Sequence, residues 1–218
     1  HELHAMAEAW FPRSGDAGLL AFGVLAAAAF WRLRAARRLW ALASPLHDAR
    51  RRAERALDQD EADPAALRDL AATQLVAGDP RADETLERAE AAAPDDPRVA
   101  LLRGRAAAMR GDPEASATHL RRAGQLLEAG PDDPALFFEI ALALGDARLR
   151  LGDAEGARLT AEAAREAVPG DLRAAVVLAD AQALGGQLAE ARRTLEKARE
   201  RAEGALRRRI ERRVRALR

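Results

Sequence analysis

The chain has 218 residues, and its 35 basic and 35 acidic side chains balance to a formal net charge of zero. This balance gives no overall reason to expect a nucleic acid or an acidic partner, and the lack of cysteine excludes disulfides and thiolate metal sites. Aromatic residues make up only 4%, while alanine, leucine, arginine and glutamate dominate, which is typical of proteins built from long helices.

An uncharged segment, residues 17–31, lies near the start of the chain. As a helix it would span about 22 Å, less than the roughly 30 Å hydrocarbon core of a bilayer. The arginines after it can snorkel to the interface, and all three tryptophans lie at or beyond its ends, as interfacial aromatics do. We therefore expect a single transmembrane helix over residues 17–33. Its anchoring side chains would be Leu19, Leu20, Phe22, Val24, Leu25, Phe30 and Trp31.

Arginines are far more frequent after this segment than in the short tail before it, residues 1–16. The positive-inside rule then predicts that the rest of the chain lies on the cytoplasmic side and the short tail outside. We expect the membrane to be the inner membrane of a bacterium. A basic stretch upstream of His1 would weaken this inference. The alternatives are a cleavable signal peptide, which normally has its basic residues before the apolar run, and a buried or interfacial helix of a soluble protein.

Residues 34–63 continue the basic character and contain a helical pattern at 46–57, with Ala49 and Ala56 seven residues apart. Pro45 is expected to break or kink the chain before this pattern. We expect a basic juxtamembrane helix here, which also caps the segment that follows.

A spacing of small residues recurs four times across residues 64–203. Gly111, Gly152 and Gly186 are each followed by small residues at offsets of 5 and 12, and the copy that starts at Gly78 is one residue shorter. The turn glycines lie 33, 41 and 34 residues apart, and a fixed period in this range predicts stacked helix pairs. Each glycine would end one helix, and the aspartate that follows three of them would cap the next. These aspartates are Asp79, Asp112 and Asp153.

Small residues are also expected where the two helices of a pair cross, at Ala71, Gly104, Gly145 and Ala179. In the third pair, the first helix at 134–151 is about one turn longer than its counterpart at 97–110. This extension carries Phe137 and Phe138, which are core side chains in the simpler interpretation and a partner pocket in the alternative.

The last segment, residues 204–218, combines one apolar stripe with a face of arginines. The stripe consists of Leu206, Ile210, Val214 and Leu217. A terminal repeat needs a cap with a polar outer face, which explains this pattern. Contact with anionic lipid or an acidic partner is the alternative, and RNA is disfavoured because no aromatics are interleaved.

The repeated pattern resembles the tetratricopeptide repeat (TPR), with its small residue in the first helix, turn glycine, two alanines in the second helix and closing proline, as at Pro94 and Pro169. The resemblance covers about residues 64–203 and implies an all-α, right-handed α-solenoid of antiparallel helix pairs. The large aromatics usual in the first helix of this family are mostly missing.

Members of this family usually bind peptides on the concave face formed by the first helix of each pair. Carried over by position, this implies a partner-binding groove made of Arg68, Arg98, Leu101, Arg105, Leu142, Asp146, Arg150, Arg173, Val176 and Asp180. The family's carboxylate clamp of lysines and asparagines is not expected, because the chain has no asparagine and a single lysine, Lys197. Arginines still suit acidic segments through bidentate hydrogen bonds, although a solvated charged face is the simpler alternative.

No serine or histidine has the spacing of a catalytic triad or a metal pair, and there is no phosphate-binding loop. His1 and His4 are only a weak metal candidate. We therefore expect no enzyme, no cofactor and no nucleic acid. The sequence is interpreted as a membrane-anchored scaffold that binds protein partners or helps to assemble a membrane complex. The alternative is a permanent accessory subunit whose small anchor residues pack against other helices.

Overall fold

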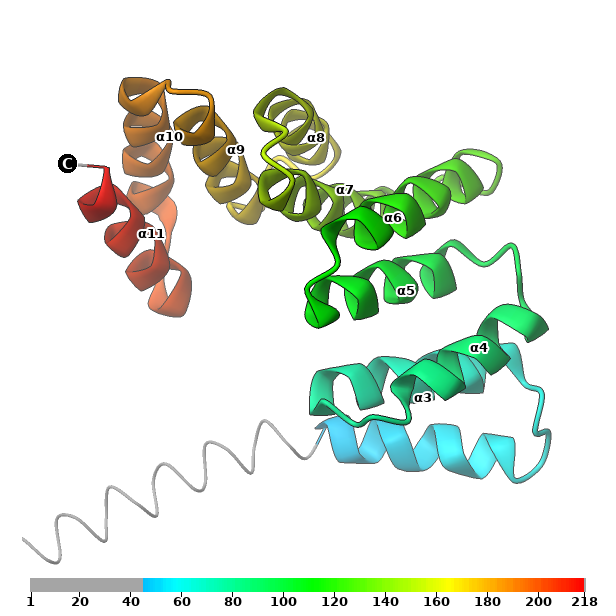
Figure 1. Cartoon of the computed structure of the whole chain (residues 1–218). Helices are drawn as coiled ribbons and strands as arrows, with labels where there is room; N and C mark the ends of the chain where they lie inside the picture. Colours follow the sequence, from blue (N-terminus) through cyan, green and yellow to red (C-terminus); the bar gives the residue numbers. More distant parts are fainter. Residues whose placement is uncertain (1–44, 218) are drawn as a thin grey trace, which may run out of the picture. The chain divides into compact units, whose positions relative to one another are not determined.

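The computed structural model describes residues 45–217, and contacts divide the chain into two units, residues 1–51 and 52–218. Residues 45–57 are helical, and residues 52–57 of this helix belong to the second unit. The second unit then consists of α3 (Pro64–Ala77), α4 (Ala82–Ala92), α5 (Pro97–Arg110), α6 (Pro113–Glu128), α7 (Pro134–Arg150), α8 (Ala154–Ala167), α9 (Arg173–Leu184), α10 (Leu188–Arg201) and α11 (Gly204–Ala216) (Figure 1).

The helices of the second unit pack in consecutive pairs, α3 with α4, α5 with α6, α7 with α8 and α9 with α10. Each pair also contacts the next pair, and the first helices α3, α5, α7 and α9 touch one another in series. This is the arrangement of a helical-repeat stack, in which each unit buries its apolar face against its neighbours. The expected all-α repeat fold is therefore observed in the described part of the chain.

The turns within the pairs form for the reason that the sequence indicated. Gly78, Gly111, Gly152 and Gly186 have φ angles of 67°, 81°, 76° and 80°, in the left-handed region that glycine adopts without steric cost. Each glycine thus lets the chain reverse within a few residues.

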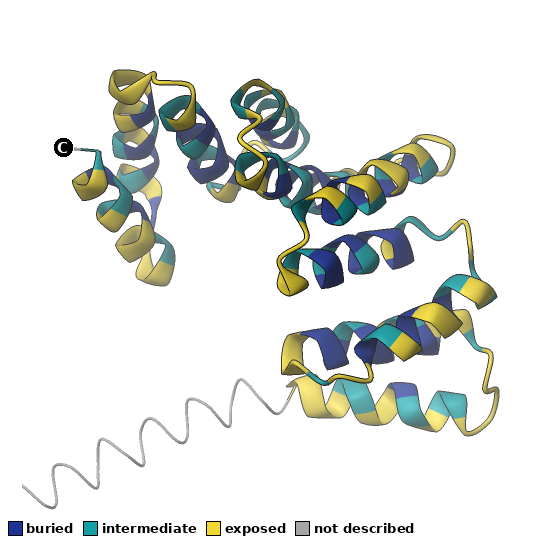
Figure 2. Ribbon diagram, viewed as in Figure 1, coloured by how far each residue is buried: buried dark blue, intermediate teal, exposed yellow. Residues whose placement is uncertain are grey.

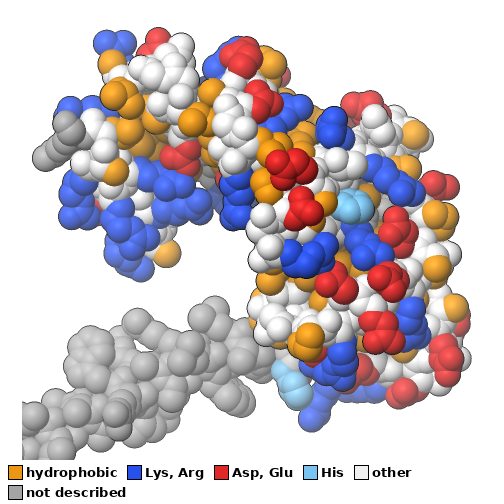
Figure 3. All heavy atoms as spheres, in the orientation of Figure 1, with side chains coloured by type: hydrophobic (Ala, Val, Ile, Leu, Met, Phe, Trp, Pro, Cys, Tyr) orange, Lys and Arg blue, Asp and Glu red, His pale blue; other side chains and the backbone are white. Residues whose placement is uncertain are grey.

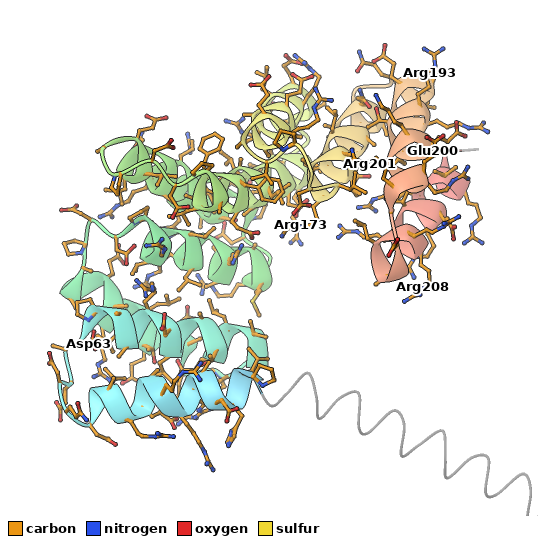
Figure 4. All side chains as sticks on the ribbon, turned by 180° about the vertical axis from the view of Figure 1, so that it is seen from behind. Asp63, Arg173, Arg193, Glu200, Arg201 and Arg208 are labelled. Carbon is orange, nitrogen blue, oxygen red and sulfur yellow. The ribbon has the colours of Figure 1, made fainter. Side chains whose placement is uncertain are left out.

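Aspartates cap most of the helices. Asp112 accepts a hydrogen bond from the Ala115 amide, and Asp153 accepts one from the Gly156 amide, as expected. Asp63 caps α3 in the same way (Figure 4). The expectation for Asp79 is wrong, because its carboxylate binds the amide and guanidinium of Arg81, and α4 begins without a side-chain cap.

Small residues form the core, as the spacing predicted. The side chains at the two offsets after each turn glycine are all buried, at no more than 5% exposure (Figure 2). At Gly104, a Cβ atom would lie 2.5 Å from Leu120 Cγ of the partner helix α6. Gly145 differs from expectation, because its close neighbour is Val177 Cγ1 of α9, at 2.8 Å from the Cβ position. It therefore fits two repeats together rather than the two helices of one pair.

The extended helix α7 has 17 residues where α5 has 14. Phe138 is 2% exposed, and Phe137 is half-buried against the same apolar clusters. Both phenylalanines are thus core side chains, which agrees with the simpler interpretation.

Helices cover both ends of the stack. Leu57 packs against the cluster of Leu67, Ala89 and Val99 at one end. At the other end, Ile210 and Val214 of α11 are buried against α9 and α10, with Leu206 and Leu217 beside them. Each end of the core is therefore shielded from water.

The expected membrane segment and the tail before it lie outside the described residues. Within residues 45–217, every helix is too short or too polar to cross a bilayer.

Candidate binding groove

Side chains from α5, α7, α9 and α11 surround a cavity of about 400 Å³, which we call the groove. Five of the ten expected groove residues line it, namely Arg105, Leu142, Asp146, Arg150 and Arg173. Glu139 and Arg209 also line it and were not expected. The first helices of successive repeats therefore do converge on one hollow.

The other five expected residues do not line this cavity. Leu101 and Val176 are 5% and 2% exposed and belong to the apolar core. Arg68, Arg98 and Asp180 are engaged in ion pairs between repeats.

These ion pairs form a series, the junction ladder, that links each first helix to the next one. A guanidinium nitrogen of Arg68 in α3 lies 3.3 Å from a carboxylate oxygen of Asp96 at the start of α5. A guanidinium nitrogen of Arg98 lies 2.8 Å from a carboxylate oxygen of Asp133 at the start of α7. Further along, Asp180 of α9 lies 2.6 Å from Arg213 of α11. A surface ion pair contributes little alone, about 0.2–1 kcal/mol, but together these pairs place an ion pair at each junction.

Glu139 is the central member of the junction ladder. Its carboxylate lies 2.5 Å from Arg105 of α5 and 2.8 Å from Arg173 of α9, so that it joins three repeats. Arg173 also binds Asp171 and lies 4.8 Å from the centre of the Phe138 ring, a cation–π geometry (Figure 4). These two arginines are held in place by the protein itself.

Asp146 lines the groove, and more than a third of its surface is exposed. Burial raises the pKa of its carboxyl, and the positive charges of Arg209, Arg150 and Arg213 oppose this rise. Burial likewise raises the pKa of Asp180, against the effect of Arg213.

Two of the groove arginines retain donors for a ligand. Arg150 donates one hydrogen bond to the Ala108 carbonyl and makes no ion pair with a described residue. The Arg209 side chain makes no hydrogen bond and no ion pair with any described residue. With four arginines against the carboxylates of Glu139 and Asp146, the groove lining carries an excess of two positive charges. It therefore suits an anionic group, such as a carboxylate.

The described residues include no cluster of three histidine or acidic side chains that could hold a metal ion. His119 is half-buried, and desolvation lowers its pKa. The weak candidates His1 and His4 lie outside the described part.

One signal in the sequence could have revealed the junction ladder. Its partners carry opposite charges and lie about one repeat apart, since Arg105 and Glu139 are separated by 34 positions and Asp180 and Arg213 by 33. Pairs of opposite charge at the repeat period therefore mark contacts between repeats.

No family model matches the chain, and no curated protein matches it either. Several solved structures are similar. A thermophilic TPR protein of Thermus thermophilus is 24% identical with a TM-score of 0.63, over 85% of this chain and 96% of that chain. PilW, a type IV pilus biogenesis factor, is 22% identical with a TM-score of 0.64, over 73% of this chain and 71% of its own. MamA is 23% identical with a TM-score of 0.57, over 72% of this chain and 82% of its own. These likenesses show that the described helix pairs have the fold of TPR proteins.

Proposed function

We propose that this chain is a protein-interaction scaffold, held at a bacterial inner membrane by residues 17–33, whose groove binds an acidic segment of a partner. The observation that carries this proposal is the groove itself, where Arg150 and Arg209 face a cavity of about 400 Å³ with an excess of positive charge. The similar solved structures include a thermophilic TPR protein and a type IV pilus biogenesis factor, which is consistent with a chain that works by binding.

The choice of an acidic segment follows from the state of the four groove arginines. Glu139 holds Arg105 and Arg173 through ion pairs, so these two arginines contribute positive potential and a rigid part of the groove lining. Arg150 and Arg209 come from different helices and can approach one carboxylate from two sides. Binding would leave the junction ladder intact, because neither of these two arginines belongs to it.

The test is the recovery of partners from native membranes with the full chain as bait. The variant Arg150→Glu with Arg209→Glu reverses both charges, and the control Arg208→Glu with Arg212→Glu makes the same change at exposed positions of α11 that do not line the groove (Figure 4). We expect the groove variant to lose about tenfold or more of the recovered partner, a difference of about 1.4 kcal/mol, and the control to keep it. Equal retention by both variants would reject the groove as the binding site.

The second candidate is a permanent accessory subunit of a membrane complex. Small residues in the expected span, Gly18, Ala21 and Gly23, would allow close packing against other transmembrane helices. Detergent purification separates the two: a stoichiometric complex favours the subunit, and a lone or transiently partnered chain favours the scaffold. Release of the chain by a carbonate wash would reject the membrane anchor in both cases.

A further inference from the structure

A second cleft, of about 510 Å³, lies between the end of α8, the start of α9 and α10. We call it the α8–α10 cleft. Its size falls within the roughly 300–1,000 Å³ of pockets that hold ligand groups. Four basic side chains form its rim, namely Arg165, Arg193, Lys197 and Arg201.

The α8–α10 cleft is distinct from the groove. Arg173 and Val177 of α9 line the groove, whereas Ala175, midway between them, lines the cleft. Residues two positions apart on a helix point about 200° away from each other, so α9 separates the two hollows. No rim residue of the cleft belongs to the groove or to the junction ladder.

The rim cations differ from the arginines that precede them in the chain. Every arginine from Arg68 to Arg158 donates a hydrogen bond to an acidic side chain or a backbone carbonyl. None of the four rim side chains makes a hydrogen bond or ion pair with another described residue. Their donors are therefore available to a ligand.

The acidic side chains near the rim do not neutralise it. Asp171 lines the cleft, but its carboxylate is bound by the Arg173 guanidinium and amide. On α10, Glu196 pairs with Arg192, and Glu200 lies between Lys197 and Arg201 in the chain without lining the cleft (Figure 4). The cleft lining thus carries an excess of three positive charges.

The floor of the cleft is apolar. Leu172 and Ala175 are half-buried there, beside Ala198, which is 4% exposed. A recessed apolar floor within a cationic rim fits an apolar side chain flanked by carboxylates. A bilayer surface meets protruding side chains more readily than recessed ones, which favours a protein segment over a membrane as the occupant.

Charge beyond the cleft supports the same partner. Residues 185–217 carry 11 basic and 5 acidic side chains, whereas residues 45–184 carry 18 basic and 27 acidic ones. Figure 3 shows Lys and Arg side chains gathered over α11, while both signs are mixed over α3 to α6. An acidic segment would therefore be attracted to the C-terminal end of the chain and repelled by the rest.

We propose that the α8–α10 cleft docks an acidic amphipathic segment of a partner protein. An apolar side chain of that segment rests on Leu172 and Ala175. Its carboxylates accept hydrogen bonds from Arg193, Lys197 and Arg201 on one side and from Arg165 on the other.

The test uses the full chain in a non-ionic detergent and a fluorescent peptide in which glutamates surround two leucines one helical turn apart. The variant is Arg193→Glu with Lys197→Glu, measured by fluorescence anisotropy at low salt. The control, Arg192→Glu with Arg199→Glu, makes the same charge change on the opposite face of α10. We expect the cleft variant to weaken peptide binding by about tenfold and the control by less than about twofold.

Further arms distinguish binding in the cleft from binding elsewhere on the chain. Replacing the peptide's leucines by alanine or its glutamates by glutamine is expected to weaken binding. The groove variant Arg150→Glu with Arg209→Glu is expected to weaken it less than the cleft variant does, and a larger loss in the groove variant would place the peptide in the groove and overturn the proposal. If the cleft variant and its control lost peptide affinity equally, the loss would follow from net charge alone, and the proposal would be overturned. The proposal would also be overturned if the unaltered chain did not bind the peptide, or if it bound phosphatidylglycerol vesicles instead of the peptide. Self-association that the cleft variant abolishes would instead make a second copy the occupant. Thermal melts of all variants serve to exclude unfolding.

Discussion

Replacing Gly104 by alanine tests how tightly the two helices of a repeat are packed. The new Cβ atom would lie 2.5 Å from Leu120 Cγ and 2.8 Å from its Cδ2, and Leu120 is only 1% exposed, so it has little room to move. Overpacking of this kind costs about 1–3 kcal/mol. Alanine in place of glycine inside a helix stabilises the folded chain by about 0.5–1 kcal/mol, so the expected net loss of stability is about 0–2.5 kcal/mol.

Gly124 supplies the matched control, because it also lies inside a helix, α6, but has no atom within 4 Å of its Cβ position. Gly124→Ala is expected to make the chain more stable by about 0.5–1 kcal/mol, because alanine favours the helix and meets no neighbouring atom there. The assay is urea denaturation of the full chain followed by circular dichroism, with midpoints compared among variants. A Gly104→Ala chain at least as stable as the Gly124→Ala chain would refute the close-packing argument.

Three further results are expected. Gly111→Ala should lower stability by about 1–2 kcal/mol in the same assay, because its φ of 81° is unfavourable for alanine although no atom lies near the Cβ position. Glu139→Gln should lower stability by roughly 1 kcal/mol through loss of its two ion pairs, and the loss should shrink at high salt; an equal loss at both salt concentrations would count against the junction ladder. An NMR titration should place the pKa of Asp146 above 3.8, and Arg209→Ala should raise this pKa further by removing an opposing charge. Since a raised pKa means that the folded chain holds the proton more tightly, the stability that Asp146 contributes should be full below about 3.8 and lost as the pH rises through its folded pKa.

The repeat architecture could be predicted because it depends on local rules. A glycine such as Gly152 must adopt a left-handed conformation wherever a helix reverses tightly, and an aspartate such as Asp153 can cap the next helix from its position in the sequence alone. The buried stripes of alanine follow from helical periodicity in the same way.

The candidate site was harder to predict because it depends on how successive repeats are rotated against each other. Position in the family pattern assigned Leu101 and Val176 to the groove, but the packing of the next repeat buries both. It assigned Arg68 and Arg98 as ligand contacts, whereas acidic residues of the following repeat bind them. Arg209 was not assigned to the groove because its helix lies outside the four repeats to which the family pattern was applied; that helix was interpreted as a cap, with lipid or an acidic partner as the alternative.

Lys197 gives the α8–α10 cleft a practical use. It is the single lysine of the chain, and its side chain lies at the rim of that cleft. An amine-selective dye would therefore place its only side-chain label there, without engineering. The label replaces the ammonium group of Lys197, so changes in its emission would report ligands that the three arginines of the rim still hold, in purified material.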